Sequence, residues 1–367
     1  MSDTVPGGSA FPLERNPKPT PPAERERLLQ NPTWGRVFTD HIFTLRFAPE
    51  RGWYDARIEP RKTFALHPGA MVLHYALEVF EGLKAYRQPD GGAALFRPDA
   101  NARRLNNSAG RLAIPALPDG MFVESVRALG RVERDWISSA DGAALYLRPF
   151  IVCTEVALGV KPGEEFLYGV IASPVSGYFK GGAPAVSVWV SEDYTRAAPG
   201  GTGAAKCGGN YAAGLLAQAQ ARREGCDQVV FLDAAERRWV EEFGAMNAFF
   251  VFDDGSLLTP PLSGAILPGI TRDSLITLAL DLGHVVREEP YSIDQWQADA
   301  QTGRLSEAFA CGTAAVVTPV GRVKGRRHGF NIGDGSAGPV TLRLKTALTD
   351  IQFGRASDPY GWLDRLF

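Results

Sequence analysis

The sequence predicts an α/β protein with two domains. The chain has 367 residues, more than a single domain of ordinary size usually contains. From Trp34 onward, short β-type runs alternate with segments of helical periodicity. A Pro- and Gly-rich stretch at 173–184 separates two such series and has the composition of a connection. We therefore expect a mobile arm over 1–33, a smaller N-terminal α/β domain over 34–172, a linker over 173–184 and a larger domain over 185–367.

The elements of the N-terminal domain follow from periodicity. The arm, "MSDTVPGGSAFPLERNPKPTPP", is rich in Pro, Gly and Ser and is expected to bury little. Beyond it we expect β-type segments at "HIFTLRF", "MVLHYALEVFEGLKAYR" and "ALYLRPFIVCT". The segments "NARRLNNSAGRL" and "FVESVRALGRVERDWI" have the spacing of amphipathic helices.

The second domain is expected to begin with strands at "AVSVWV", "DQVVFLD", "RWVEEF" and "NAFFVF". A helix follows, with Thr271 as its predicted N-cap and Gly283 as its end. Ser292 and Gln295 have the spacing of a capping box for a further helix. A strand-like segment, "AFACGTAAVVTPV", and a last helix over about 339–354 complete the domain.

Composition excludes several classes of protein. The net charge of −2 and pI near 6.3 do not favour binding to nucleic acid. No apolar run is long enough to span a membrane, and the N-terminus lacks a signal pattern, so we expect a cytoplasmic protein. The four cysteines and five histidines are scattered, so neither a disulfide framework nor a metal site is predicted.

One segment, "APGGTGAAKCGGNYAAG", places Lys206 among glycines and alanines. A phosphate-binding P-loop is one interpretation, because Gly200 and Lys206 have its outer spacing. However, Ala205 replaces the required glycine, and Cys207 replaces the hydroxyl residue that would bind Mg²⁺. A solvent-exposed loop lysine is the plain alternative.

A Schiff-base lysine is the third interpretation. Such an amine must lose its proton before it attacks an aldehyde, and burial among apolar neighbours promotes that loss. If the aldehyde is pyridoxal phosphate (PLP), the chain must also supply an anion site, a carboxylate for the ring nitrogen and a donor to the ring oxygen.

Each of these three demands has a candidate. The motif "LPGITRDSL" presents the backbone N–H groups of Ile270 and Thr271 at a helix N-terminus, which suits a phosphate. Tyr211 follows Lys206 closely enough to reach the same ring. For the carboxylate, strand alternation turns only one of Glu241 and Glu242 inward, and periodicity alone leaves the choice open.

The ordered series of motifs resembles a known family. "ALEVFEGLKAY", "FRPDANARRLNNSA", "LYLRPF", "KCGGNYAAG", "EEFGAMN", "LPGITRDS" and "EAFACGTAAVVTPV" are similar to motifs of the branched-chain amino acid aminotransferases, which are class IV, fold type IV PLP enzymes. The similarity runs over about 34–350. It implies a two-domain α/β (α+β) fold whose larger, PLP-binding domain has a mixed, barrel-like β core, with the active site at the domain interface.

The resemblance assigns roles to the cofactor residues. Lys206 would be the Schiff-base lysine, Tyr211 the donor to the ring oxygen and Glu242 the partner of the pyridine nitrogen. Arg104 would bind the phosphate. The phosphate site would be completed by Ile270, Thr271 and Thr313.

The resemblance also implies substrate and subunit contacts. The side-chain pocket would comprise Tyr75, Phe80, Tyr146, Arg148 and Ala245, with Arg148 receiving the second carboxylate of glutamate. The backbone of Thr313 and Ala314 would hold the α-carboxylate. Leu158 and Val160 would be donated by the partner chain of a homodimer.

The implied activity is reversible ping-pong transamination of L-leucine, L-isoleucine or L-valine with 2-oxoglutarate. Small amino acids and 2-oxo acids would be the substrates. The alternatives of the same fold are a D-amino acid aminotransferase and an aminodeoxychorismate lyase. A catalytically silent PLP carrier is an alternative of a different class.

Overall fold

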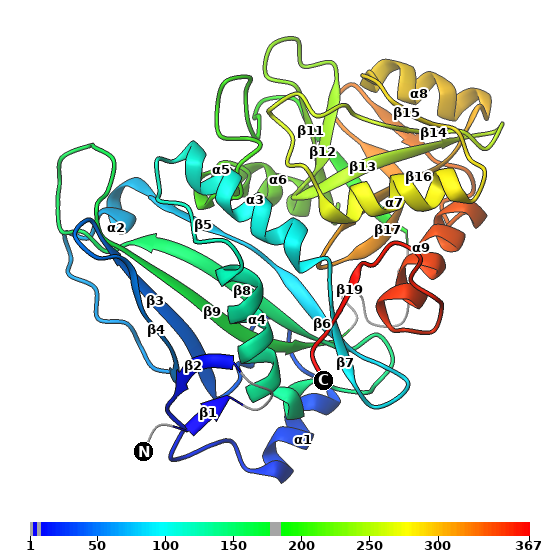
Figure 1. The fold of residues 1–367 in the computed structure, drawn as a ribbon. Coiled ribbons are helices and arrows are strands. Elements are labelled where there is room, and N and C mark those ends of the chain that lie inside the picture. Colours follow the sequence, from blue (N-terminus) through cyan, green and yellow to red (C-terminus); the bar gives the residue numbers. More distant parts are fainter. Residues whose placement is uncertain (1–2, 6–8, 177–184) are drawn as a thin grey trace. The chain divides into compact units, whose positions relative to one another are not determined.

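The computed structural model describes residues 3–5, 9–176 and 185–367, which form two compact units (Figure 1). Unit 1 contains the described residues up to 176 together with 205–208 and 351–367. Unit 2 contains 185–204 and 209–350. The predicted domain boundaries remain a prediction, and residues 177–184 of the predicted linker lie outside the described residues. The first residues of that linker, 173–175, continue a strand.

Unit 1 is built on one sheet, in which long antiparallel strands occupy the centre. Its strand order is β1 (Asp3–Val5), β2 (Ser9–Leu13), β4 (Gly52–Pro60), β3 (His41–Ala48), β9 (Phe166–Val175), β8 (Ala144–Cys153), β6 (Leu83–Arg87), β7 (Ala93–Phe96) and β19 (Leu363–Arg365), and β5 (Glu78–Phe80) also pairs with β8. Since side chains alternate along a strand, Tyr146 and Arg148 of β8 share one face.

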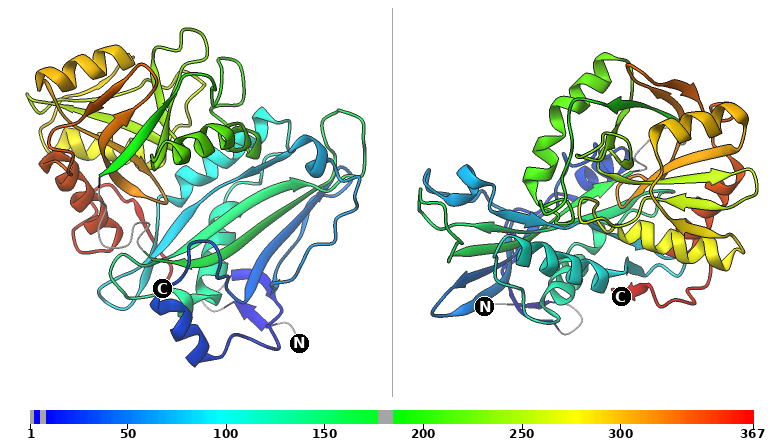
Figure 2. Two further views of the ribbon diagram at one scale, coloured as in Figure 1. Left: turned by 180° about the vertical axis from the view of Figure 1, so that it is seen from behind. Right: turned by 90° about the horizontal axis from the view of Figure 1, so that it is seen from above.

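Helices pack on one face of the unit 1 sheet. The apolar face of α4 (Met121–Val132) packs on β3 and β9, and α3 (Pro98–Arg111) lies beside α4 (Figure 2). The short 3₁₀ helix Arg134–Trp136 follows and buries Trp136. The C-terminal strand β19 pairs with β7, which explains why residues 351–367 belong to this unit.

Two expectations for the first eighty residues were wrong. Residues of the predicted arm do bury surface, because Phe11 and Leu13 of β2 lie in the core and α1 (Pro22–Gln30) follows. The β-type run starting at Met71 begins with a short helix, α2 (Met71–Tyr75), before β5 and β6. That helix ends at Ala76, whose φ of 48° turns the chain sharply into β5.

Unit 2 contains a closed ring of strands. Strand β12 (Val240–Phe243), at one end of the strand series, also pairs with β13 (Met246–Phe252) and so closes six strands into a ring. The ring runs through β12, β11 (Gln228–Leu232), β10 (Val186–Ser191), β17 (Val316–Lys324), β16 (Leu305–Gly312) and β13, and β14 (Leu257–Thr259), β15 (Val286–Glu288) and β18 (Gly329–Asn331) extend it. The predicted mixed, barrel-like core is therefore confirmed.

Helices surround this ring. They are α5 (Gly208–Ala213), α6 (Leu215–Arg223), α7 (Ile270–Asp281), α8 (Ile293–Thr302) and α9 (Pro339–Gln352). The predicted cap of α8 is confirmed, since Ser292 Oγ accepts the Gln295 N–H at 3.1 Å. The predicted cap of α7 was wrong, because Gly269 occupies the N-cap and Thr271 lies inside the first turn.

The described residues contain neither a membrane-spanning helix nor a cluster of metal-binding side chains. Within residues 3–5, 9–176 and 185–367, no helix is long and apolar enough to cross a membrane. In the same part of the chain, no three His, Cys, Asp or Glu side chains gather as a metal site.

Candidate active site

The segment carrying Lys206 is held by its backbone in unit 1. The carbonyl of Lys206 accepts the N–H of Phe80 in β5 at 2.9 Å. The N–H of Lys206 donates to Ser108 Oγ in α3, also at 2.9 Å. The N–H of Gly208 donates to the carboxylate of Glu78. Since these contacts fix the main chain on both sides of Lys206, the start of its side chain has a defined position.

The amine of Lys206 has an unusual environment for a lysine. Its Nζ lies 4.8 Å from the centre of the Phe80 ring. Burial, followed by the positive charge of Arg104, lowers the pKa of Lys206 to about 8, while Glu81 and Tyr146 act in the opposite direction. A much larger fraction of this amine is therefore neutral near pH 7 than in an exposed lysine.

Arg104 forms a buried ion pair that the sequence did not reveal. Its Nε and Nη2 donate to the two oxygens of Glu81 at 2.6 and 2.9 Å, and Asn101 Nδ2 donates to the same carboxylate at 2.7 Å. Burial raises the pKa of Glu81, but Arg104, Lys206 and Asn101 together bring it below its usual value. No local pattern indicates this pair, because Arg104 lies 23 residues after Glu81 in the sequence.

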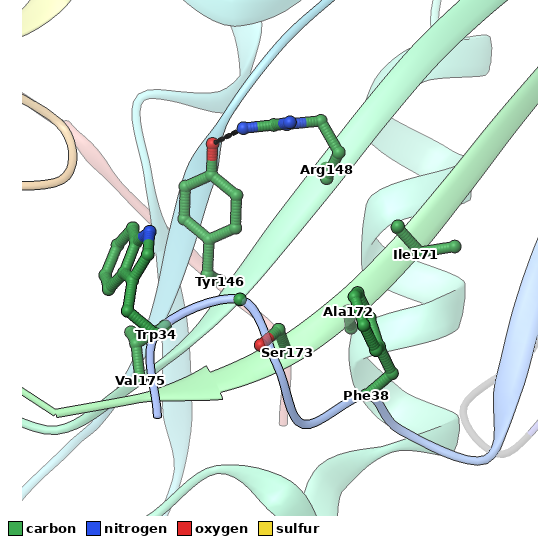
Figure 3. Close-up of a pocket in the computed structure, with 9 residues that line it drawn as sticks. Trp34, Phe38, Tyr146, Arg148, Ile171, Ala172, Ser173 and Val175 are labelled. Atoms are coloured by element: carbon green, nitrogen blue, oxygen red, sulfur yellow. Dashed lines mark hydrogen bonds between the residues drawn. The ribbon is translucent and has the colours of Figure 1, made fainter. Parts of the chain in front are cut away.

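Tyr146 and Arg148 line one cavity on their shared sheet face (Figure 3). Arg148 Nη2 donates to the Tyr146 hydroxyl at 2.8 Å, and the Arg148 guanidinium lies 4.7 Å from the centre of the Phe80 ring. The cavity has a volume of about 230 Å³ and is also lined by Trp34, Phe38, Ile171 and Ser173, among others. Phe80 thus contacts both the Lys206 amine and the Arg148 guanidinium.

Trp34 is a cavity residue that sequence reasoning missed. Its ring centre lies 5.4 Å from that of Tyr146, and the amine of Lys84 lies 5.7 Å from the indole. Trp34 stands alone before the first predicted strand, so no local pattern connects it with β8. Figure 3 shows the Trp34 indole beside the Tyr146 ring at the cavity.

The structure distinguishes Glu242 from Glu241 in unit 2. Glu242 Oε2 lies 3.0 Å from Arg196 Nε, and Glu242 Oε1 accepts the N–H of Leu267 at 2.8 Å. Glu241 is also buried, and burial raises its pKa to about 7 despite the nearby charge of Arg196. At neutral pH, Glu242 is therefore the better supported of the two as a fixed carboxylate.

The start of α7 is open to an anion. Gly269 at the N-cap has no side chain to accept the N–H groups of the first turn, which includes Ile270 and Thr271. A Cβ at Gly269 would lie 1.9 Å from Asn247 Oδ1, so a larger residue here would displace the Asn247 side chain. Leu267, just before the helix, is bound to both Glu242 and Asn247.

The remaining predicted residues of unit 2 lie in turns and on α5. Thr313 and Ala314 lie in the turn between β16 and β17, and Val316 after it has a φ of 60°. A β-branched residue rarely adopts this conformation, and such backbone strain is common at functional sites. Ala245 lies in the two-residue turn from β12 to β13, and Tyr211 lies on α5.

Three residues of the predicted substrate and partner-chain sets lie together in unit 1. The Tyr75 hydroxyl at the end of α2 donates to the carbonyl of Leu158. Leu158 is 70% exposed and Val160 is 85% exposed. Tyr75 is thus joined to the loop that the resemblance gives to the neighbouring subunit.

Comparison with known proteins identifies the family. A family model described as amino-transferase class IV matches residues 78–323. A branched-chain-amino-acid aminotransferase of Mycobacterium tuberculosis is 55% identical over 364 residues, which cover 98% of this chain and 99% of the relative. This chain belongs to the branched-chain amino acid aminotransferases. The recognition made from the motifs is therefore confirmed.

Other branched-chain aminotransferases support the same assignment. Branched-chain-amino-acid transaminase 1 of Bacillus subtilis is 44% identical over 330 residues, covering 90% of this chain and 92% of the relative. The Escherichia coli enzyme has a structure that matches with a TM-score of 0.73 at 31% identity, covering 89% of this chain and 99% of that one. The fold type IV prediction is confirmed, and neither the D-amino acid aminotransferase nor the lyase alternative is favoured.

The cofactor of this aminotransferase is PLP, as the class IV assignment implies. Another branched-chain aminotransferase, solved with pyridoxamine 5′-phosphate, matches this chain with a TM-score of 0.73 at 31% identity, covering 88% of this chain and 98% of that one. Two observations on the present structure fit this group. The Lys206 amine has a lowered pKa, and α7 begins without a side-chain cap.

Proposed function

We propose that this aminotransferase exchanges the amino group of L-leucine, L-isoleucine or L-valine with 2-oxoglutarate, and that Lys206 is its catalytic residue. The products are branched-chain 2-oxo acids and L-glutamate. The observation that carries the proposal is the amine of Lys206, which has a pKa of about 8 and lies against Phe80. A neutral amine can attach covalently to an aldehyde, whereas a protonated one cannot.

Six further residues are proposed to hold the cofactor. Glu242 is the carboxylate for the ring nitrogen, and its ion pair with Arg196 favours the charged form that this role needs. Tyr211 is the donor to the ring oxygen. The phosphate is bound by Arg104, Ile270, Thr271 and Thr313. When bound, PLP supplies an electron sink that lets the Cα of an amino acid lose its proton.

Lys206 is also proposed to move that proton. Once released from its covalent link, its Nζ would take the proton from Cα of the amino acid and deliver it to the C4′ carbon of the cofactor, and in the reverse half-reaction it would move a proton from C4′ to Cα. The low pKa supports this role, because a base titrating near the working pH can both accept and release a proton. The backbone of Thr313 and Ala314 is proposed to hold the substrate α-carboxylate meanwhile.

The cavity of Figure 3 is proposed to receive the substrate side chain. Trp34 and Tyr146 of the cavity lining supply apolar surface for a branched side chain. Phe80, which lies against Arg148, and Ala245 are proposed as further substrate contacts because the resemblance implies them. Arg148 supplies a cation for the second carboxylate of glutamate. Its hydrogen bond to Tyr146 and its place over Phe80 support an arginine that is held at the cavity wall.

A second copy of the chain is the proposed partner. Exposed Leu158 and Val160 would cost free energy if they stayed in water, and covering them by a second copy removes that cost. Tyr75, bound to Leu158, is proposed to reach the partner's substrate site with this loop. The cytoplasm is the proposed location.

Reductive trapping tests the central assignment. Borohydride treatment of the holoenzyme, followed by peptide mapping, should place a pyridoxyl group on Lys206. Lys206→Ala should lose turnover with 2-oxoglutarate and L-leucine, and D-alanine should not replace L-leucine as amino donor in the wild type. A pyridoxyl group on another lysine, or normal turnover of the variant, would overturn the proposal.

A further inference from the structure

Arg196 binds three separate segments of unit 2 with one guanidinium. Its Nε lies 3.0 Å from Glu242 Oε2. Its Nη2 donates to the carbonyl of Gly203 at 3.3 Å and also to the carbonyl of Ala265. Arg196 is 8% exposed, so it makes these contacts in the protein interior. Neither the sequence motifs nor the roles proposed above include this residue.

We propose that Arg196 is a positioning residue that holds Glu242 ionised and in a fixed orientation toward the cofactor ring. The inference rests on the proposed role of Glu242. Arg196 does not itself contact the reacting atoms; it acts through the carboxylate.

The backbone around Arg196 is built for this arrangement. A Cβ at Gly203 would lie 2.3 Å from the carbonyl oxygen of Ala265, so only glycine lets the two loops approach so closely. This close approach brings both carbonyls within reach of one guanidinium. The planar guanidinium of arginine can face two carbonyls and a carboxylate at once.

The same contacts fix the second oxygen of Glu242. Leu267 donates its N–H to Glu242 Oε1, and the Leu267 carbonyl accepts from Asn247 Nδ2 at 3.0 Å. Glu242 and Asn247 are themselves cross-strand neighbours in the β12–β13 hairpin. Leu267 thus holds one oxygen of Glu242 by a hydrogen bond, while Arg196 lies in ion-pair contact with the other.

Glu241 shows what the ion pair changes. It is the adjacent residue on the same strand and is buried to a similar extent, 6% exposed against 2% for Glu242. Among the described residues, the ion pair of Arg196 is with Glu242 and not with Glu241. Burial raises the pKa of Glu241 to about 7. A carboxyl in that state is partly protonated at neutral pH, whereas a cation at 3.0 Å favours the anion.

The test is a double-mutant cycle on the full-length enzyme, with Arg196→Met, Glu242→Gln and the combined variant. The readouts are PLP affinity from fluorescence titration, the pH dependence of the bound-cofactor absorbance, and kcat and KM. Arg196→Met should weaken PLP binding and lower kcat by about 10- to 100-fold, because the loss of one contact to a charged group typically changes an equilibrium by this factor. KM for L-leucine should change far less. Glu241→Gln is the matched control and should leave all readouts near wild type.

The combined variant shows whether Arg196 acts through Glu242 or independently of it. If Arg196 acts through Glu242, the combined variant is no worse than Glu242→Gln alone. Multiplying losses, or an Arg196→Met variant with the wild-type absorbance profile, would overturn the inference. If Arg196→Met does not fold, Arg196→Lys is used in its place, because it keeps the positive charge and should retain the wild-type absorbance profile. A shift of that profile matching the shift of Glu242→Gln would overturn the inference. If Glu242→Gln itself behaves as wild type, the proposed role of Glu242 fails rather than the coupling.

Discussion

The pKa of Lys206 can be measured directly in the cofactor-free enzyme. The structure gives a value of about 8 in place of 10.5. At pH 7, about 10% of an amine with the lower value is neutral, against about 0.03% with the higher value. Lys206 should therefore react with an amine-selective reagent roughly 300-fold faster at pH 7 than a lysine with the ordinary pKa, other factors being equal.

The lowered pKa of Lys206 also makes the stability of the protein depend on pH. Between pH 8 and 10.5, the folded amine of Lys206 is mostly neutral while the unfolded amine still carries its proton. The unfolded state then binds more protons, so the contribution of Lys206 to the free energy of unfolding increases as the pH rises through this window, because the cost of deprotonating the amine on folding falls.

Two substitutions should move this pKa in opposite directions. Arg104→Gln removes a cation and should raise the pKa of Lys206, by up to about one unit. Glu81→Gln removes an anion and should lower it. Because breaking a buried ion pair costs about 3–5 kcal/mol, circular dichroism and size-exclusion chromatography must first show that each variant is folded.

Competitive acetylation supplies the assay. Trace acetic anhydride is added across pH 6–11 and the labelled peptides are quantified. Lys18 is an internal reference, because its side chain is exposed and lies outside the proposed interface loop. If Lys206 titrates together with Lys18, or if both substitutions move the pKa of Lys206 the same way, the electrostatic reasoning is refuted. The wild-type curve remains decisive even where a variant does not fold.

Three further outcomes are expected. Arg148→Met should lower kcat/KM for L-glutamate about tenfold more than for L-valine, because only glutamate has a second carboxylate; equal losses in half-reaction kinetics would contradict this role. Trp34→Ala should lower kcat/KM for L-leucine by about tenfold or more by removing apolar surface from the cavity, and an unchanged donor profile would exclude it from the pocket. Leu158→Asp combined with Val160→Asp should weaken self-association, as measured by sedimentation velocity, and an unchanged sedimentation coefficient would remove this loop from the interface.

Local patterns predicted those features whose determinants are close in sequence. The Ser292 cap and the strands of the β12–β13 hairpin depend on neighbouring residues, and the structure confirms them. The Lys206 segment was recognised as unusual because glycines and alanines surround a single lysine. Its lowered pKa agrees with the burial expected from those neighbours.

Pairs that join distant parts of the chain could not be predicted in this way. Trp34 meets Tyr146 although β9 lies between β3 and β8 in the sheet, and no periodicity encodes that contact. Nothing in the local pattern indicated that Phe11 of the supposed arm belongs to a core. The short helix α2 was missed because five residues contain barely more than one helical turn.

The two buried Arg–Glu pairs have a common explanation in the cost of burying charge. Arg104–Glu81 in unit 1 and Arg196–Glu242 in unit 2 each remove two charges from water, and apolar residues of similar volume often stabilise a fold at least as well. Stability alone is therefore a weak reason for either pair. In each pair, one member is a residue proposed to bind the cofactor, Arg104 at the phosphate and Glu242 at the ring nitrogen. A charged ligand group needs an opposite charge that is already oriented and ionised before binding, and a buried counter-ion meets both needs without reorganisation. On this reasoning Glu81 orients the Arg104 guanidinium, as we infer that Arg196 orients the Glu242 carboxylate.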